Sequence, residues 1–136
     1  MKSFTLIEIV IAIFIITVGT VGAFTMIQRV LSFTSLTTSQ LQAAYLAQEG
    51  IENIRNVRDG NWLEQRSGFE TAWDEGINSG DWQQVYFLDG SPSKFQRKIG
   101  IARPEADKMT VSVQIKWSER GVTHEVVVQT ELRNWY

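Results

Sequence analysis

The chain has 136 residues, a formal net charge of −2 and 43% hydrophobic residues. This length accommodates one compact domain. The slightly acidic balance argues against a nucleic-acid-binding protein, because such proteins carry basic patches. The sequence has no cysteine, which excludes disulfide scaffolds, thiol catalysis and cysteine-based zinc sites. Its one histidine, His124, leaves little material for acid–base catalysis. We therefore expect neither an enzyme nor a bound cofactor or metal.

An almost unbroken apolar run opens the chain. Residues 4–27 read FTLIEIVIAIFIITVGTVGAFTMI, with Glu8 as the one charged residue and no proline. As a helix this run would span roughly 36 Å, enough to cross a hydrocarbon core of about 30 Å. The run therefore predicts a transmembrane helix. A secretory signal peptide is the alternative, with Lys2 as its charged region and a cleavage site after Ala23.

Glu8 has two interpretations. A carboxylate at the centre of a bilayer costs about 3 kcal/mol, but near the helix start the cost falls and the helix dipole favours a negative charge. The first interpretation is thus a tolerated interfacial acid. In the second, cleavage before Phe4 creates an α-amine four residues from Glu8, and such an amine titrates at about 7.7–8.0. Glu8 would then pair with its own amine or with that of a neighbouring subunit.

The segment Lys2-Ser3-Phe4-Thr5-Leu6-Ile7-Glu8, followed by the apolar helix, resembles a prepilin leader and cleavage motif. The family comprises type IV pilins, type II secretion pseudopilins and competence pseudopilins. The resemblance implies that residues 1–3 form a leader, which prepilin peptidase removes between Ser3 and Phe4. It further implies that Phe4 becomes the N-methylated first residue and that Glu8 guides subunit docking. Ser3 stands where the family usually has glycine.

The apolar helix is predicted to continue as an amphipathic one. Apolar residues after Arg29 recur at spacings of three and four, which is helical periodicity; they are Leu41, Ala44, Ala47, Ile51 and Ile54. We expect one helix from about Thr5 to about Arg58, whose second half, 29–58, packs one face on a soluble domain. Asp59-Gly60-Asn61 is interpreted as its stop.

A connecting loop is predicted over residues 60–83, which are rich in glycine and polar residues. A loop of this length in a compact domain is either packed or functional. Its aromatic residues are Trp62, Phe69, Trp73 and Trp82. We expect them to anchor the loop on the helix or the sheet, with a ligand platform as the alternative.

Residues 84–136 alternate between apolar and polar side chains, which is typical of an antiparallel sheet with one buried face. Three series share this period: Phe95, Arg97, Ile99 and Ile101; Met109, Val111, Val113, Ile115 and Trp117; and Val122, His124, Val126, Val128 and Leu132. Turns are predicted at 119–121 and 103–107, and a short edge strand at 85–88. The fold class is therefore α+β, a long helix packed on a sheet of three to four strands.

This architecture also resembles that of the pilin family. Three regions follow: a leader (1–3), a transmembrane or filament-core helix (4–28) and a soluble domain (29–136). The chain lacks the C-terminal cysteine pair of many major pilins and the proline that many members carry in the first helix. Both departures favour a minor pilin or pseudopilin.

Several polar residues are weighed as sites. Four acids in predicted loops, Asp81, Asp89, Glu105 and Asp107, offer oxygen ligands for calcium, but no EF-hand spacing is present. A small basic group, Lys94, Arg97 and Lys98, is interpreted as a solvated strand face, too sparse for a phosphate footprint. His124 lies on the apolar side of its strand, where a structural role outweighs a catalytic one.

The leading hypothesis is a structural subunit of a type IV pilus-like or type II secretion pseudopilus filament. The resemblance implies four kinds of partner: prepilin peptidase, other pilin or pseudopilin subunits, an inner-membrane assembly platform and, before assembly, membrane lipid. It also implies a single-pass cytoplasmic-membrane protein with an extracytoplasmic C-terminal domain, found after assembly in a cell-surface or periplasmic filament.

The second hypothesis is a membrane-tethered binding module that does not polymerise, and the third is a secreted soluble protein. A fragment starting near Gln28 is expected to be soluble and folded.

Overall fold

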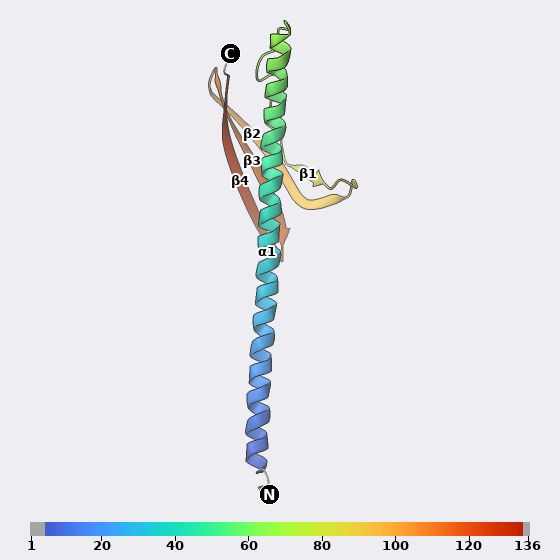
Figure 1. Cartoon of the computed structure of the whole chain (residues 1–136), viewed down its shortest axis with the longest axis vertical. Helices are drawn as coiled ribbons and strands as arrows, with labels where there is room; N and C mark the ends of the chain where they lie inside the picture. Colours follow the sequence, from blue (N-terminus) through green and yellow to red (C-terminus); the bar gives the residue numbers. More distant parts are fainter. Residues whose placement is uncertain (1–4, 135–136) are drawn as a thin grey trace. The chain divides into compact units, whose positions relative to one another are not determined.

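The protein consists of one helix and one sheet, as Figure 1 shows in a computed structural model that describes residues 5–134. The elements are α1 (Leu6–Arg66), β1 (Gln83–Tyr86), β2 (Pro92–Glu105), β3 (Lys108–Glu119) and β4 (Val122–Arg133). The predicted α+β class is confirmed. The chain divides into two compact units, Met1–Thr38 and Ser39–Tyr136. The sheet and the part of α1 that packs on it belong to the second unit.

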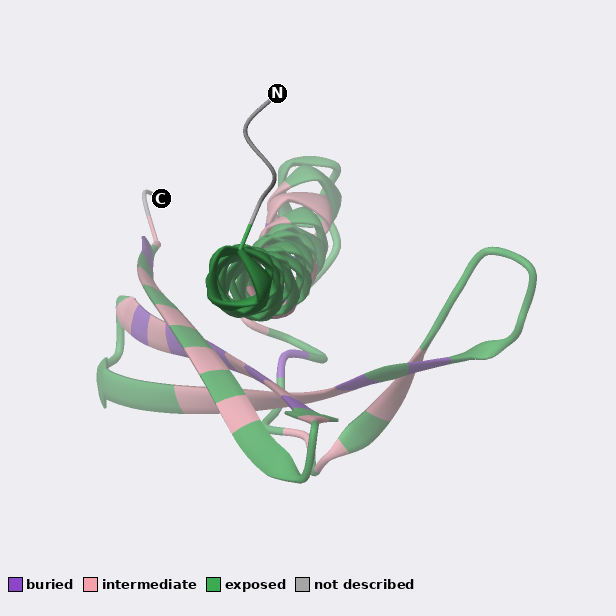
Figure 2. Ribbon diagram, turned by 90° about the horizontal axis from the view of Figure 1, so that it is seen from below, coloured by how far each residue is buried: buried purple, intermediate pink, exposed green. Residues whose placement is uncertain are grey.

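The four strands form an antiparallel sheet in the order β1-β2-β3-β4. The core runs along β3, where the side chains of Met109, Val111, Val113, Ile115 and Trp117 are buried. Figure 2 shows this alternation as stripes of buried and half-buried residues along the strands. The period-two pattern in the sequence thus identified the buried face correctly, because successive side chains of a strand point to opposite faces.

The helix meets this row of large side chains with small ones. Ala43, Ala47 and Gly50 are buried on α1, together with Ile51. A Cβ atom on Gly50 would lie 3.0 Å from Cγ1 of Val113, so the helix backbone lies against the Val113 side chain with little room for a larger residue. The predicted apolar face was wrong at Leu41, which is 56% exposed. Because the large side chains of β3 fill the space between helix and sheet, the helix places its smallest residues there rather than its most apolar ones.

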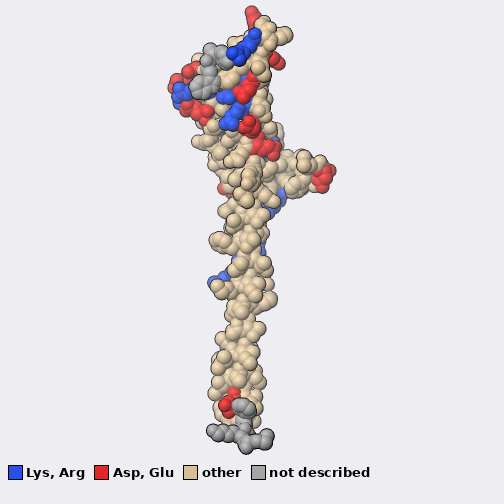
Figure 3. Space-filling model, viewed as in Figure 1, with Lys and Arg blue, Asp and Glu red and all other residues tan. Residues whose placement is uncertain are grey.

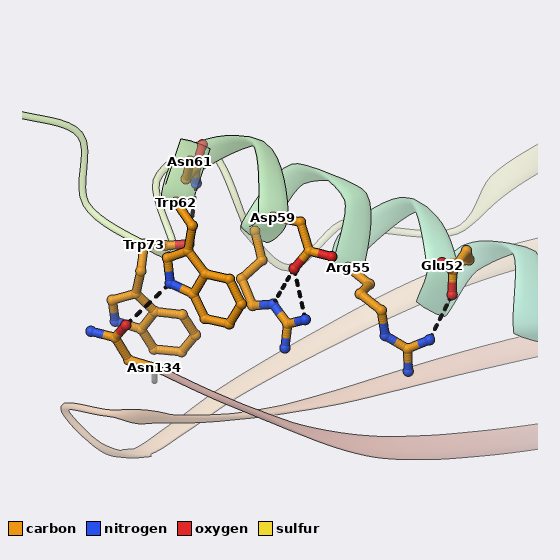
Figure 4. A network of polar contacts seen from close by, with 8 residues as sticks. Glu52, Arg55, Asp59, Asn61, Trp62, Trp73 and Asn134 are labelled. Atoms are coloured by element: carbon orange, nitrogen blue, oxygen red, sulfur yellow. Dashed lines mark hydrogen bonds and ion pairs between the residues drawn. The ribbon is translucent and has the colours of Figure 1, made fainter. Parts of the chain in front are cut away.

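The predicted end of the helix was also wrong, since α1 continues past Asp59-Gly60-Asn61 to Arg66. Gly60 lowers helix propensity, but its neighbours are held by tertiary contacts. The Asn61 side chain donates to the backbone oxygens of Trp73 (3.2 Å) and Glu75 (2.9 Å), as Figure 4 shows in part.

The actual stop of α1 is a glycine beyond the predicted one. Gly68 has φ 92°, its N–H donates to the Gln65 oxygen (3.1 Å), and the N–H of Phe69 donates to the Glu64 oxygen (3.2 Å). These two bonds form a Schellman motif, in which a left-handed glycine satisfies the last carbonyl groups of a helix.

Between α1 and β1 the loop is packed, as expected, but not through all of its aromatic residues. Trp73 is buried beside the non-aromatic Ile77, whereas Phe69 is exposed. Trp82 lies under the Lys116 ammonium group, 4.0 Å from the ring centroid. Arg103 of β2 further fixes the loop, with its Nε 2.6 Å from a carboxylate oxygen of Asp74.

Both predicted turns between long strands are present, in tighter forms. Arg120 and Gly121 have φ of 56° and 78°, which matches a two-residue type I′ hairpin between β3 and β4. The β2–β3 connection is reduced to residues 106–107, because Arg103 and Pro104 remain in β2. The edge strand β1 ends at Tyr86, two residues before the predicted end at 88.

The contact of Gly50 with β3 generates a prediction. Gly50→Leu should lower the free energy of unfolding by about 1–3 kcal/mol, because the added atoms overpack the helix–sheet contact. Gly60→Leu is the matched control: no atom lies within 4 Å of its Cβ position, so it should be neutral or stabilising. Urea unfolding of the fragment that starts at Gln28 measures both. Equal stability of the two variants would contradict the close approach at Gly50.

Candidate functional site: the N-terminal part of α1

The first turn of α1 is closed by Thr5. Its hydroxyl oxygen accepts from the backbone N–H of Glu8 at 3.4 Å, and its carbonyl oxygen accepts from the N–H of Ile9 at 3.3 Å. Threonine at the N-cap with glutamate three residues later is the sequence pattern of a capping box. This pattern of neighbouring residues locates the helix start.

The Glu8 side chain is exposed in this first turn, where the positive end of the helix dipole favours a carboxylate. No side chain among residues 5–134 pairs with it. Ser3 and Phe4, the predicted cleavage and methylation residues, lie outside the described residues. The structure therefore places Glu8 at the helix start and leaves its predicted pairing with an α-amine untested.

Beyond Glu8 the helix is apolar on every side. The consecutive residues Ile13, Phe14, Ile15 and Ile16 are each between 60% and 67% exposed. Since successive helix residues point about 100° apart, these four cover the full circumference. A helix that is hydrophobic all round is one that is buried in lipid or among other helices, not one that packs a single face on a core.

The charge-free part of this helix has the length of a bilayer core. Glu8 and Arg29 bracket residues 9–28, which carry no charge, and Figure 3 shows the corresponding surface free of charged side chains. Twenty residues of helix span about 30 Å, the thickness of the hydrocarbon layer. By length and composition α1 is long and apolar enough to cross a membrane.

The hydroxyl groups in this segment are satisfied inside the helix. Thr17, Thr20 and Thr25 each donate to the carbonyl oxygen four residues earlier, at 2.7–2.8 Å. These bonds remove the penalty that free hydroxyl groups would carry in lipid. Glu8 thus differs from the threonines, because its carboxylate has no such local partner among the described residues.

A polar cluster ties the helix to the sheet in the second unit. Ser39, which is 2% exposed, donates its hydroxyl to Oε2 of Glu119 at 2.7 Å and accepts from Nζ of Lys94 at 2.6 Å. Lys94 and Glu119 also form an ion pair at 3.2 Å. A serine beside a lysine can be a catalytic pair, but an ion-paired ammonium has no lone pair to take the hydroxyl proton. The cluster is best described as a clamp between α1, β2 and β3.

The four acids weighed as calcium ligands lie apart, in three different connections. Asp81 accepts from the N–H of Trp82 at 2.8 Å. The hydroxyl and the N–H of Ser91 hold the pKa of the Asp89 carboxyl below its ordinary value. Glu105 is the last residue of β2, and Asp107 lies in the turn between β2 and β3. Among residues 5–134 no three acidic or histidine side chains gather as a metal site.

The other weighed residues have structural partners. His124 stacks on Trp117 with ring centroids 5.3 Å apart. In the basic group, Arg97 pairs with Glu49 at 3.2 Å and Lys94 belongs to the clamp, while Lys98 is half-buried on β2. Two of these three basic side chains thus pair with acids of the chain itself, and the group does not form a basic patch.

No family model, curated protein or solved structure matches the chain. The architecture is nevertheless pilin-like: a long N-terminal apolar helix that packs against a four-stranded antiparallel sheet.

The clamp generates the prediction of this section. Ser39→Ala should lower the free energy of unfolding by about 1–3 kcal/mol, because it removes two hydrogen bonds to charged groups in a buried position. Gln40→Ala, at the neighbouring exposed position, should change it by less than about 0.5 kcal/mol. Both are measured in the fragment from Gln28. Equal effects would contradict a stabilising role for the clamp.

Proposed function

We propose that this protein is a non-enzymatic structural subunit of a filament that resembles type IV pili or type II secretion pseudopili. The observation that carries the proposal is the segment 9–28, apolar on every side and bracketed by Glu8 and Arg29. A helix of this kind is stable in lipid, and it is equally stable when other apolar helices surround it. Copies held in the membrane can therefore enter a filament core, where protein replaces lipid around the same side chains.

In this proposal, an ion pair of Glu8 fixes the position of each subunit relative to its neighbour. We propose that prepilin peptidase removes residues 1–3 and that the new amine of Phe4, N-methylated, pairs with Glu8 of a neighbouring subunit. In an apolar surrounding an unpaired carboxylate is strongly unfavourable, so a subunit docks only where its Glu8 meets a cation. The proposed partners are this peptidase, further pilin-like subunits and an assembly platform in the cytoplasmic membrane.

A membrane-tethered binding module is the second candidate. An open groove of about 620 Å³ between α1 and β4 favours it, because the groove is large enough for a peptide or a small ligand. In this function the apolar helix serves only as an anchor, and Glu8 serves only to start it.

The mature N-terminus tests the proposed function most directly. Protein from native cells should begin at Phe4 and carry a mass increment of one methyl group, as read by Edman degradation or mass spectrometry. Retention of Met1 would favour the tethered module, because its anchor needs no processing. A start at Phe24 would overturn both functions, since the anchor would be lost.

Two substitutions separate the two roles of Glu8. Glu8→Gln keeps a capping-box residue but removes the charge, whereas Thr5→Ala removes the cap and keeps the charge. If Glu8 pairs with an amine, Glu8→Gln should lower the ratio of sheared surface protein to membrane protein at least tenfold, roughly the effect of losing 1.4 kcal/mol. Thr5→Ala should change this ratio little. If Thr5→Ala lowers this ratio more than Glu8→Gln does, Glu8 acts only by stabilising the helix start.

A further inference from the structure

The sheet carries an arm with an apolar tip. Residues 85–94, from the end of β1 to the start of β2, extend beyond Phe95, where β2 begins to pair with β3. At the tip Tyr86, Phe87 and Leu88 are 62%, 57% and 111% exposed. Figure 2 shows this arm as an exposed loop beyond the edge of the sheet. Single exposed apolar residues are common on proteins, but three consecutive large ones mark an interaction surface.

Hydrogen bonds within the arm tip (residues 86–92) fix its shape. The N–H of Phe87 donates to the Ser91 oxygen at 2.9 Å, and the N–H of Gly90 donates to the Phe87 oxygen at 2.9 Å. Asp89 accepts from both the N–H and the hydroxyl of Ser91. A preorganised tip loses little conformational entropy when it binds, which favours docking.

The opposite edge of the sheet carries a groove that the arm tip of the same copy does not occupy. We call it the α1–β4 groove; its volume is about 620 Å³, and apolar atoms of Tyr45, Ile51 and Val128 contribute to its lining. Because β1 and β4 are the two ends of the strand order, the arm and the groove lie at opposite edges. One chain therefore offers both a protrusion and a recess.

The charges of the two surfaces are compatible, because each acid that lines the groove already pairs with an arginine of its own chain; Glu49 pairs with Arg97 at 3.2 Å. Glu52 in the groove pairs with Arg55 at 2.7 Å through one nitrogen, and Arg55 keeps 41% of its side chain exposed. A guanidinium group has five N–H donors and can accept a second carboxylate. Asp89 of the arm tip is such a carboxylate, and its bonds with Ser91 keep its pKa low.

We propose that the arm tip of one copy docks into the α1–β4 groove of the next copy in the assembled filament, with Phe87 and Leu88 in the groove and Asp89 near Arg55. This inference rests on the proposed function. The contact is head-to-tail, and such a contact repeats from copy to copy instead of closing after two.

The size of this contact fits an assembly rather than a dimer in solution. Two side chains, Phe87 and Leu88, at about 200 Å² each, give roughly 800 Å² over both partners. Stable interfaces bury about 1,200–2,000 Å². The contact therefore forms where another segment already holds the copies together and raises their effective concentration, and the apolar part of α1 supplies that condition.

Cysteine cross-linking in the full chain tests this proposal, and the absence of native cysteine makes introduced pairs unambiguous. A chain with both Leu88→Cys and Gln129→Cys should give a ladder of disulfide-linked multimers on mild oxidation of membrane and sheared surface fractions. Leu88→Cys with Ser118→Cys is the matched control, since Ser118 is exposed on the sheet outside the groove. Adding Phe87→Ser should reduce the ladder about tenfold, whereas adding Phe69→Ser should not.

The outcomes separate this contact from the filament function. A ladder confined to the 88–129 pair supports the contact, whether or not the protein reaches the surface fraction. Surface protein without a ladder in either fraction overturns the contact and leaves the filament function intact. Absence of both surface protein and ladder overturns both. Equal ladders from the 88–118 pair, or from Leu88→Cys alone, also overturn it, because the tip would then contact another surface.

Discussion

The second unit depends on the close approach of α1 to β3. Met109, Val111, Val113, Ile115 and Trp117 line one face of β3, and the helix meets them with alanine and glycine. Because protein interiors are packed as densely as organic crystals, large side chains on the sheet leave room only for small side chains on the helix. The Ser39 clamp then ties the helix to β2 and β3, and the Asn61 bonds tie the end of the helix to the loop that follows it.

One helix serves two environments, and its side chains change accordingly. Over residues 9–28 the apolar residues surround the helix, the threonine hydroxyls bond back to the helix itself, and Glu8 precedes the segment. From Ser39 onward only one face is buried, and it is buried against the sheet. The two parts of the helix therefore differ in what surrounds their apolar side chains: those of the first part are exposed on every side, whereas the second part buries one face against the sheet.

The candidate site was predicted only where local sequence decides it. Glu8 stood out because a charge in an apolar run needs a reason, and the structure places it in the first turn of the helix, as its sequence position required. The capping role of Thr5 was also readable in the sequence. The Ser39 clamp could not be predicted from the sequence. Lys94 and Glu119 reach Ser39 only once the sheet has formed, and they have no regular spacing from Ser39 in the chain.

The sequence by itself determined the apolar helix, the buried face of β3 and the hairpin at Arg120-Gly121, because helix and strand periodicities and left-handed turns are properties of neighbouring residues. Only the tertiary structure decided that Ala43 rather than Leu41 faces the sheet and that α1 ends at Arg66, before Gly68, instead of at about Arg58. It also decided that Tyr86, Phe87 and Leu88 remain exposed on an arm. These outcomes depend on what lies opposite each residue: the large side chains of β3, the carbonyl groups of the following loop, and open solvent beyond the sheet edge.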